Sequence, residues 1–261
     1  MSDLPEACIA NILSFTDPLV ACNLSMVSST FRNAARSDTV WQRFLPPDCV
    51  SIISRSSDPN LLLAYSKKQL FFSLCRNPIL IDDGKRSFSL EKWTGKKCFM
   101  LSARDLRIVW ADTPRYWSWK SDSDSRFAEV AVLIDVCWLE ISGKIDTKML
   151  SAVTNYGAYL VFKLNPNNYG LQPPAEAKVG FNGSEIATRS VYLDFIPRRN
   201  SQAAAGYPKE RGDGWMEVEL GSFFNNDGTD EELEISVLEV KNGNWKRGLI
   251  VEGIEIRPKL A

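Results

Sequence analysis

The sequence contains no histidine among its 261 residues. Histidine is the usual general base beside a serine or cysteine nucleophile, and it is a frequent ligand of catalytic zinc. Its absence therefore excludes Ser-His and Cys-His hydrolases, histidine proton shuttles and His-ligated zinc enzymes. Any remaining catalytic chemistry would depend on carboxylates, lysine or tyrosine.

Features that mark other protein classes are missing as well. The six cysteines lie far apart and form no C-x-x-C pair, which favours free thiols in a reducing compartment over a zinc ribbon or redox dithiol. The formal net charge is −1, so no overall field attracts nucleic acid. No apolar run approaches the ~18 residues that span a bilayer, and the first residues do not resemble a secretory signal. We expect no metal, no cofactor, no nucleic acid and no membrane among the partners.

Glycine is missing from the first 83 residues, and all fifteen glycines of the chain lie at or after Gly84. A long glycine-free segment favours helices, whereas glycine-punctuated sequence favours turns between strands. The sequence therefore predicts a helical N-terminal part and a β-rich remainder.

Three short helices are indicated within the first part. Ile9, Ile12 and Leu13 recur at helical spacing and form one apolar stripe. Asp17-Pro18 is an N-cap followed by an N1 proline, and it starts a second helix that continues through residue 24. A third stripe covers residues 27–35. Such short helices have little core of their own, so part of their apolar surface should face a partner, unless they only cap the β-rich part.

The spacing of particular residues in this part is more specific. L-P-E-x-x-I-x-x-I-L-S-F at Leu4–Phe15, V-S-x-x-F-R at Val27–Arg32 and S-D-x-V-W at Ser37–Trp41 together resemble an F-box. In that family the segment docks on the Skp-type adaptor of a cullin–RING ubiquitin ligase. The resemblance implies that the adaptor is contacted by Leu4, Pro5, Ile9, Ile12, Leu13, Val27 and Trp41.

A connector is expected over residues 48–91. Asp48–Pro59 is polar in character. Ser66 and Gln69 have capping-box spacing, which predicts a short helix that ends near Arg76. Asp83-Gly84 is a common turn pair and predicts a hairpin between its flanking apolar runs.

The remainder of the chain alternates in the manner of strands. Leu106, Ile108 and Trp110 form a period-two pattern that predicts a strand. Further strands are expected at Val136–Ile145, Ala158–Leu164, Val191–Ile196, Trp215–Leu220, Leu233–Val240 and Leu249–Arg257. Their irregular spacing and intervening turn residues indicate an antiparallel sandwich. The predicted fold class is therefore an α+β multidomain chain, in which a short three-helix unit precedes a jelly-roll-like antiparallel β-sandwich.

This β-rich part also contains family-specific patterns. D-T-P-R-Y-W-S-W-K at Asp112–Lys120, D-G-W-M-E at Asp213–Glu217 and G-L-I-V-E-G-I-E-I-R-P at Gly248–Pro258 resemble the phloem protein 2-type (Nictaba-type) plant lectins. With the F-box, the resemblance implies an F-box at 1–47, a connector at 48–91 and a lectin-like sandwich at 92–261. It also implies a location in the cytoplasm, the nucleus or both.

The resemblance implies binding of N-acetylglucosamine oligomers and N-glycan cores. Two tryptophans of the family stack on sugar rings, and they correspond to Trp110 and Trp117. Two glutamates accept hydrogen bonds from sugar hydroxyls, and they correspond to Glu232 and Glu239. Trp119 shares the parity of Trp117 and is either a third contact or a core residue. Ring faces and carboxylates suit this chemistry.

The spacing of the two glutamates complicates that site. Because Glu232 and Glu239 are seven residues apart, a regular strand would point them to opposite faces. Glu239 continues the apolar face formed by Leu233, Ile235 and Val237. We therefore expect either a bulge between the two acids or an approach of Glu232 from the preceding loop.

These patterns lead to one function hypothesis and two alternatives. The chain is expected to be a non-catalytic substrate-recognition subunit, which binds a Skp-type adaptor and cullin ligase complex on one side and a glycan or glycoprotein target on the other. One alternative is a protein-binding sandwich with a vestigial sugar site. The other is a glycoside hydrolase that uses two carboxylates, although the acids in question look suited to hydroxyl hydrogen bonding.

Overall fold

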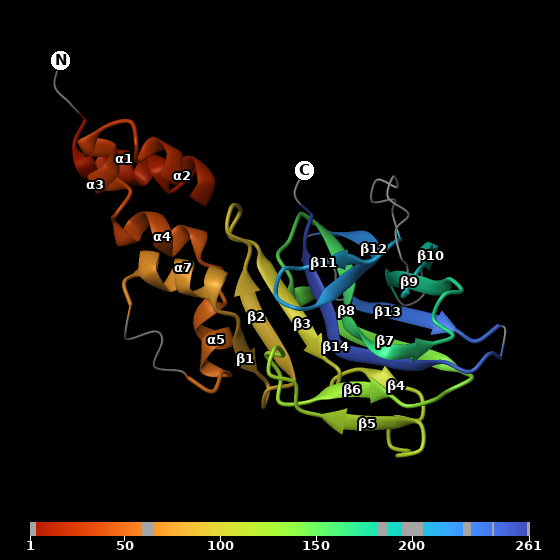
Figure 1. The fold of residues 1–261 in the computed structure, drawn as a ribbon. Helices are drawn as coiled ribbons and strands as arrows, with labels where there is room; N and C mark the ends of the chain where they lie inside the picture. The colour runs from red at the N-terminus through yellow and green to blue at the C-terminus, as the bar shows by residue number, and fades with distance from the viewer. Residues whose placement is uncertain are drawn as a thin grey trace. The chain divides into compact units, whose positions relative to one another are not determined.

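The computed structural model describes residues 4–58, 65–181, 187–194, 206–226, 231–241 and 243–259. The chain divides into two compact units. The first comprises residues 1–83 and 87–98, and the second comprises residues 84–86 and 99–261 (Figure 1). None of the helices in the described ranges has the length and apolarity that a bilayer crossing requires.

Short helices with defined starts build the first unit. They are α1 (Glu6–Leu13), α2 (Pro18–Leu24), α3 (Ser29–Ala34), α4 (Asp38–Phe44), α5 (Cys49–Ser54) and α7 (Lys67–Arg76). Asp17 accepts the N–H of Val20 at 2.7 Å and so satisfies one of the amides that a helix start leaves unpaired. Ser66 and Gln69 form the capping box that starts α7. The helix starts predicted at Asp17 and Ser66 are confirmed.

The core of the first unit centres on Trp41. Its side chain is fully buried, and its ring centroid lies 5.5 Å from Phe44, 5.2 Å from Phe71 and 5.0 Å from Phe72. The indole N–H donates to the carbonyl of Ala35 at 2.7 Å. These contacts pack α4 against α7, and the buried N–H keeps a partner, as an aromatic core residue requires.

The expectation of a polar connector over Asp48–Pro59 is wrong for its first part. Residues 49–54 form α5, which buries Cys49, Ile52 and Ile53. Those three positions have the i, i+3, i+4 spacing of a helix, but the stripe is only two turns long and serines interrupt it. Burial within the unit, where α5 contacts the strand Ile79–Ile81, supplies the stability that so short a segment lacks alone.

A hairpin follows α7, as predicted. Strand β1 (Ile79–Ile81) pairs with β2 (Arg86–Leu90). The turn between them has left-handed backbone at Asp82, Asp83 and Gly84, with φ values of 55°, 55° and 77°. Aspartate and glycine are the residues that tolerate this conformation best, which is why the turn pair was readable in the sequence.

The larger sheet of the second unit is antiparallel in every described pairing. Along it β3, β14, β8, β12 and β11 lie in that order, while β6 pairs with β14 and β5 pairs with β6 (Figure 1). The strands are β3 (Lys97–Ser102), β5 (Trp117–Lys120), β6 (Val130–Leu133), β8 (Thr154–Tyr169), β11 (Lys209–Glu210), β12 (Met216–Asn225) and β14 (Arg247–Pro258).

The smaller sheet has five strands in the order β10, β9, β13, β7, β4. They are β10 (Ala187–Val191), β9 (Ala175–Phe181), β13 (Glu232–Glu239), β7 (Leu139–Asp146) and β4 (Arg107–Ile108). In β7 and β13 buried residues alternate with more exposed ones, so one face of this sheet packs on the core and the other faces solvent.

The two sheets approach each other closely at glycines. A Cβ atom at Gly221 of β12 would lie 2.9 Å from Val179 of β9, and one at Gly143 of β7 would lie 3.0 Å from Leu101 of β3. The absence of a side chain thus lets the sheets pack face to face. The predicted fold class, helices followed by an antiparallel β-sandwich, is confirmed.

Three details of the strand predictions were wrong. The strand expected at Leu106–Trp110 is reduced to β4, because the left-handed backbone of Trp110 ends it. The strand expected at Val191–Ile196 is misplaced: Val191 ends β10, residues 192–194 are not strand, and 195–196 lie outside the described residues. Strand β9 was not anticipated, since small residues and glycine weaken its apolar signal.

Candidate functional site

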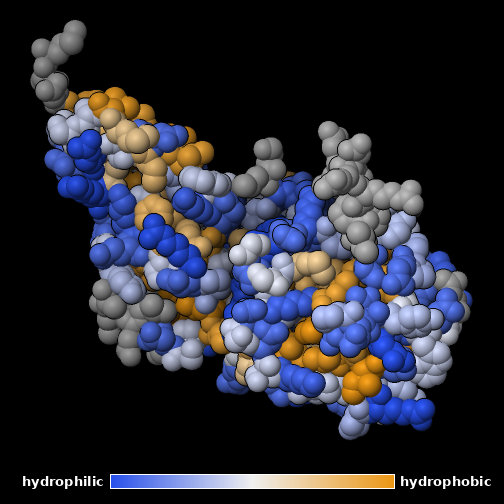
Figure 2. Space-filling view, viewed as in Figure 1, coloured by the Kyte–Doolittle hydropathy of each residue, from blue (hydrophilic) through white to orange (hydrophobic). Residues whose placement is uncertain are grey.

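An apolar surface covers part of the helical unit and is here called the helical apolar face. Its members are exposed large side chains of α1, α2 and the adjoining turns: Leu4, Ile12, Phe15, Leu19, Val20, Met26 and Val27. Ile12 is 55% exposed and Val27 is 68% exposed. Figure 2 shows apolar atoms gathered on this part of the unit. A face of this size on so small a unit is typical of an interaction site.

The residues predicted to contact the adaptor divide into two groups. Leu4, Pro5, Ile12 and Val27 are exposed and lie where a partner could touch them. The other three, Ile9, Leu13 and Trp41, are buried within the unit. In this fold the buried group packs inside the unit, and only the exposed group is accessible to a partner.

Trp110 is the exposed member of the two predicted stacking tryptophans. It lies two residues after the end of β4, its φ is 62°, and the residue is 42% exposed. The ring lies on Tyr116 with centroids 5.1 Å apart. A non-glycine residue in left-handed backbone costs on the order of 1 kcal/mol, so the surrounding structure holds this indole in place. A half-exposed ring that its neighbours hold in one orientation suits stacking on the apolar face of a partner.

Trp117 and Trp119 are less accessible than Trp110. Trp117 is 2% exposed, and its N–H donates to the carbonyl of Val109 at 3.1 Å. The ring of Trp119 is covered by the guanidinium of Arg104, whose central carbon lies 3.7 Å from the centroid. The structure therefore places Trp117 in the core and does not bring the two predicted stacking rings to one surface.

The two predicted glutamates lie on opposite faces of β13. The strand pairs with β7 without a register shift from Glu232, opposite Asp146, to Glu239, opposite Leu139. The parity argument is thus confirmed, and the bulge or loop approach that was expected to reconcile the two acids is wrong. Glu232 lies on the outer face, where its carboxylate meets the ammonium of Lys144 at 2.6 Å.

Glu239 has a structural partner instead of a surface position. It is buried and forms an ion pair with Lys246, which is also buried. The ammonium of Lys246 donates further to the carbonyls of Cys137 at 3.0 Å and Asn244 at 2.6 Å. A buried carboxylate needs such a partner. As folded, the carboxylate of Glu239 is paired with this buried cation, and the residue is 5% exposed.

A second charged cluster, on the larger sheet, is internally satisfied. The guanidinium of Arg211 forms ion pairs with Glu217 and Glu255 at 2.7 Å each. Arg257 forms ion pairs with the same two carboxylates, at 2.6 Å in the case of Glu217. Burial would raise the pKa of Glu255, but the bonds from Arg211 and the charge of Arg257 outweigh it and hold that pKa below its ordinary value. These groups have the character of a structural network.

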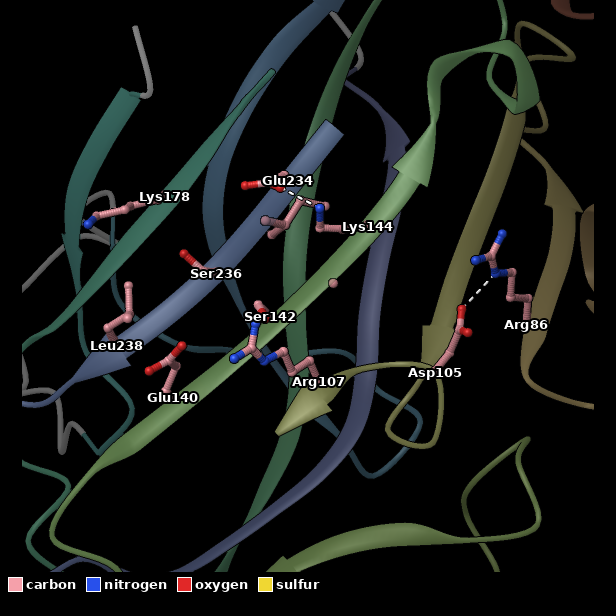
Figure 3. Close-up of a pocket in the computed structure, with 12 residues that line it drawn as sticks. Arg86, Asp105, Arg107, Glu140, Ser142, Lys144, Lys178, Glu234, Ser236 and Leu238 are labelled. Carbon is pink, nitrogen blue, oxygen red and sulfur yellow. Dashed lines mark hydrogen bonds and ion pairs between the residues drawn. The ribbon is translucent and has the colours of Figure 1, made fainter. Parts of the chain in front are cut away.

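The outer face of the five-stranded sheet holds a hollow that the sequence did not predict, here called the outer groove. Its volume is about 500 Å³. Its lining includes the side chains of Arg86, Asp105, Arg107, Glu140, Ser142, Lys144, Lys178, Glu234, Ser236 and Leu238 (Figure 3). None of the four predicted sugar-binding residues lines it. Within the described ranges, no cluster of three acidic or cysteine side chains is placed to hold a metal ion.

Comparison with known proteins covers nearly the whole chain. A model of the phloem protein 2 family matches residues 96–258, and a model of the F-box domain matches residues 1–43. F-box protein At2g02240 of Arabidopsis thaliana is 49% identical over 98% of this chain and 79% of its own length. F-box protein PP2-B10 of the same plant is 49% identical over 97% of this chain and 92% of its own length.

One solved structure is a weak match in fold. TmCBM61 in complex with beta-1,4-galactotriose matches 60% of this chain and 91% of that chain, at 10% identity and a TM-score of 0.34. A likeness at this level carries no argument about binding.

Proposed function

Because the chain belongs to the phloem protein 2 family and carries an F-box at its N-terminus, we propose that it is a substrate-recognition subunit of a cullin–RING ubiquitin ligase. In this proposal the helical unit docks on a Skp-type adaptor, and the β-rich unit captures the protein to be modified. The contribution is proximity, and the chain itself catalyses no step. The proposed location is the cytoplasm, the nucleus or both.

The observation that supports the docking half is the helical apolar face. Ile12 and Val27 remain exposed although a soluble unit gains free energy by burying such side chains, about 1.5–3 kcal/mol for each when fully buried. Covering the face with a partner recovers that free energy. The buried Ile9, Leu13 and Trp41 hold the exposed residues in position from within.

The docking half is tested by measuring affinity for a Skp-type adaptor. Ile12→Asp combined with Val27→Asp places two charges on the face and should weaken binding at least tenfold. The melting temperature should stay close to that of the wild type, because both side chains are exposed. Val50→Asp is the matched control, since Val50 is an exposed valine of α5 outside the face. Absence of adaptor binding by the intact wild type would contradict the proposal.

For target capture we propose that the indole of Trp110 stacks on an N-acetylglucosamine-containing glycan. Support comes from its half-exposed ring, its contact with Tyr116 and its maintained left-handed backbone. The burial of Trp117 and Glu239 favours the alternative, a protein-binding sandwich with a vestigial sugar site. The two candidates therefore differ in whether Trp110 contacts a sugar or a protein side chain.

Titration with chitotriose separates these candidates. If the glycan proposal holds, the wild type binds chitotriose and Trp110→Ala does not. Trp245→Ala is the control and should still bind, since Trp245 is another exposed tryptophan of the same unit. Absence of binding at millimolar chitotriose would favour protein recognition.

A further inference from the structure

One row of polar side chains crosses all five strands of the smaller sheet. Arg107 of β4 is opposite Ser142 of β7, which is opposite Ser236 of β13, then Lys178 of β9 and Thr188 of β10. Directly opposed residues in adjacent antiparallel strands point to the same face. With four strand spacings, the row is roughly 19 Å long.

The short side chains in the middle of this row make a trough. Ser142 and Ser236 are flanked along their own strands by the longer Glu140, Lys144, Glu234 and Leu238, and Figure 3 shows these side chains on the same face. The outer groove continues into a neighbouring hollow of about 610 Å³, which shares Lys178 and Leu238 with it. The trough is therefore elongated and has the dimensions of a short oligosaccharide lying across the strands.

Most charges around the trough are already paired. Arg86 meets Asp105 at 2.6 Å, Lys144 meets Glu234 at 2.5 Å, and Lys178 meets the neighbouring Glu176 at 2.9 Å. These pairs leave little net charge to attract or repel a ligand.

Arg107 is the exception. Among the described residues its guanidinium has no hydrogen-bond or ion-pair partner, and the hydroxyls of Ser142 and Ser236 have none either. The nearest acid along β7, Glu140, accepts the indole N–H of Trp138 at 2.9 Å, which holds its carboxylate elsewhere. Figure 3 shows Arg107 beside Ser142 over β7. The groove thus combines one free cation with two free hydroxyls and a carboxylate.

We propose that the outer groove binds an acidic oligosaccharide, a glycan with a carboxylate on its sugar ring. Arg107 binds the carboxylate through two parallel N–H donors, a geometry specific to guanidinium. Ser142 and Ser236 exchange hydrogen bonds with ring hydroxyls, and the free oxygen of Glu140 accepts another. A neutral glycan leaves the cation unused.

A phosphopeptide fits this groove less well. A phosphate group carries close to two negative charges, whereas one free cation faces it here. Glu140 also lies two residues from Ser142, at the next position of β7 on the same face. In the outer groove itself the large apolar residues are Leu238 and the buried Ile235, so a peptide side chain finds little apolar surface there. The backbone groups of the central strands are already paired within the sheet, so no strand can be added on this face.

The experiment is calorimetric titration of the full chain with trigalacturonate. The matched ligand control is its methyl ester, which keeps the shape and removes the charge. Wild type should bind trigalacturonate at least tenfold more tightly than the ester, and Arg107→Gln should lose at least that factor. Ser236→Val should also weaken binding by filling the trough, while valine keeps strand propensity. Arg36→Gln changes another exposed arginine that has no hydrogen-bond or ion-pair partner among the described residues, and it should have no effect.

Several outcomes would overturn the inference. They are absence of trigalacturonate binding by the wild type, equal affinity for acid and ester, unchanged affinity of Arg107→Gln, or tighter binding of a phosphoserine peptide at the groove. Loss of trigalacturonate binding in Trp110→Ala would likewise refute a site separate from Trp110. Failure of chitotriose binding alone would count against the Trp110 proposal and leave this one standing.

Discussion

Replacing Trp117 and Trp110 separately tests whether Trp117 is a core residue and Trp110 a surface residue. Trp117 is 2% exposed and its N–H is bonded to the carbonyl of Val109, so Trp117→Ala creates a cavity and leaves that carbonyl without its partner. Loss of a buried tryptophan costs about 3–5 kcal/mol. For a domain of this size each kcal/mol lowers the melting temperature by about 2–4 °C, so the expected decrease is about 6–20 °C.

Trp110→Ala should behave differently. The residue is 42% exposed. Alanine, like tryptophan, is a non-glycine residue, so the substitution leaves the strain of the left-handed backbone unchanged. The expected loss is below about 1 kcal/mol, and Trp110→Gly should recover part of it because glycine adopts positive φ without strain. If Trp110 binds a glycan, Trp110→Ala loses chitotriose affinity at nearly unchanged stability.

The assay is thermal unfolding followed by near-ultraviolet circular dichroism, with attention to the transition of the β-rich unit. The two compact units can unfold separately, so each transition is fitted on its own. A decrease of less than about 2 °C for Trp117→Ala would refute the assignment of this residue to the core and return it to the surface site.

Three further predictions follow from buried groups. Glu239→Ala should lower the free energy of unfolding by about 3–5 kcal/mol, because it leaves Lys246 buried without its carboxylate. The double variant Glu239→Leu with Lys246→Met should recover most of that loss, and urea unfolding measures both effects. Burial raises the pKa of Glu252, so the folded state holds its proton more tightly and stability falls as pH rises through that raised pKa. Glu252→Gln should therefore gain stability relative to wild type as the pH rises above about 4, the ordinary pKa of glutamate, and a constant difference would contradict this. Burial raises the pKa of Cys49 to about 11 and that of Cys75 to about 12. Iodoacetamide near pH 8 should therefore modify the exposed Cys8 much faster than either of them. Equal modification rates, measured by mass spectrometry, would refute this prediction.

The helical unit was largely readable from its residues. N-cap and capping-box side chains act within three residues of a helix start, so Asp17 and Ser66 marked their helices without any tertiary information. The segment α5 escaped because its stripe of Cys49, Ile52 and Ile53 is too short to stand out, and only packing stabilises it.

The same contrast holds for the candidate sugar site. Spacing alone showed that Glu232 and Glu239 face opposite sides of a regular strand, and the register of β13 on β7 confirms it. Sequence could not show that Lys246 lies against Glu239, because that contact depends on how separate segments pack. Nor could it distinguish Trp117 from Trp110, since both are tryptophans in the same aromatic run.

By itself the sequence determined the class of the protein: helices with an F-box pattern, then alternating strands with the patterns of the phloem protein 2 family. Only the tertiary structure decided which of those residues reach the surface. The outer groove shows the reason most clearly, because Arg107, Ser142, Ser236 and Lys178 come from four strands far apart in the chain. Alternation reveals which residues of one strand share a face, whereas strand order and register are set by non-local pairing and packing.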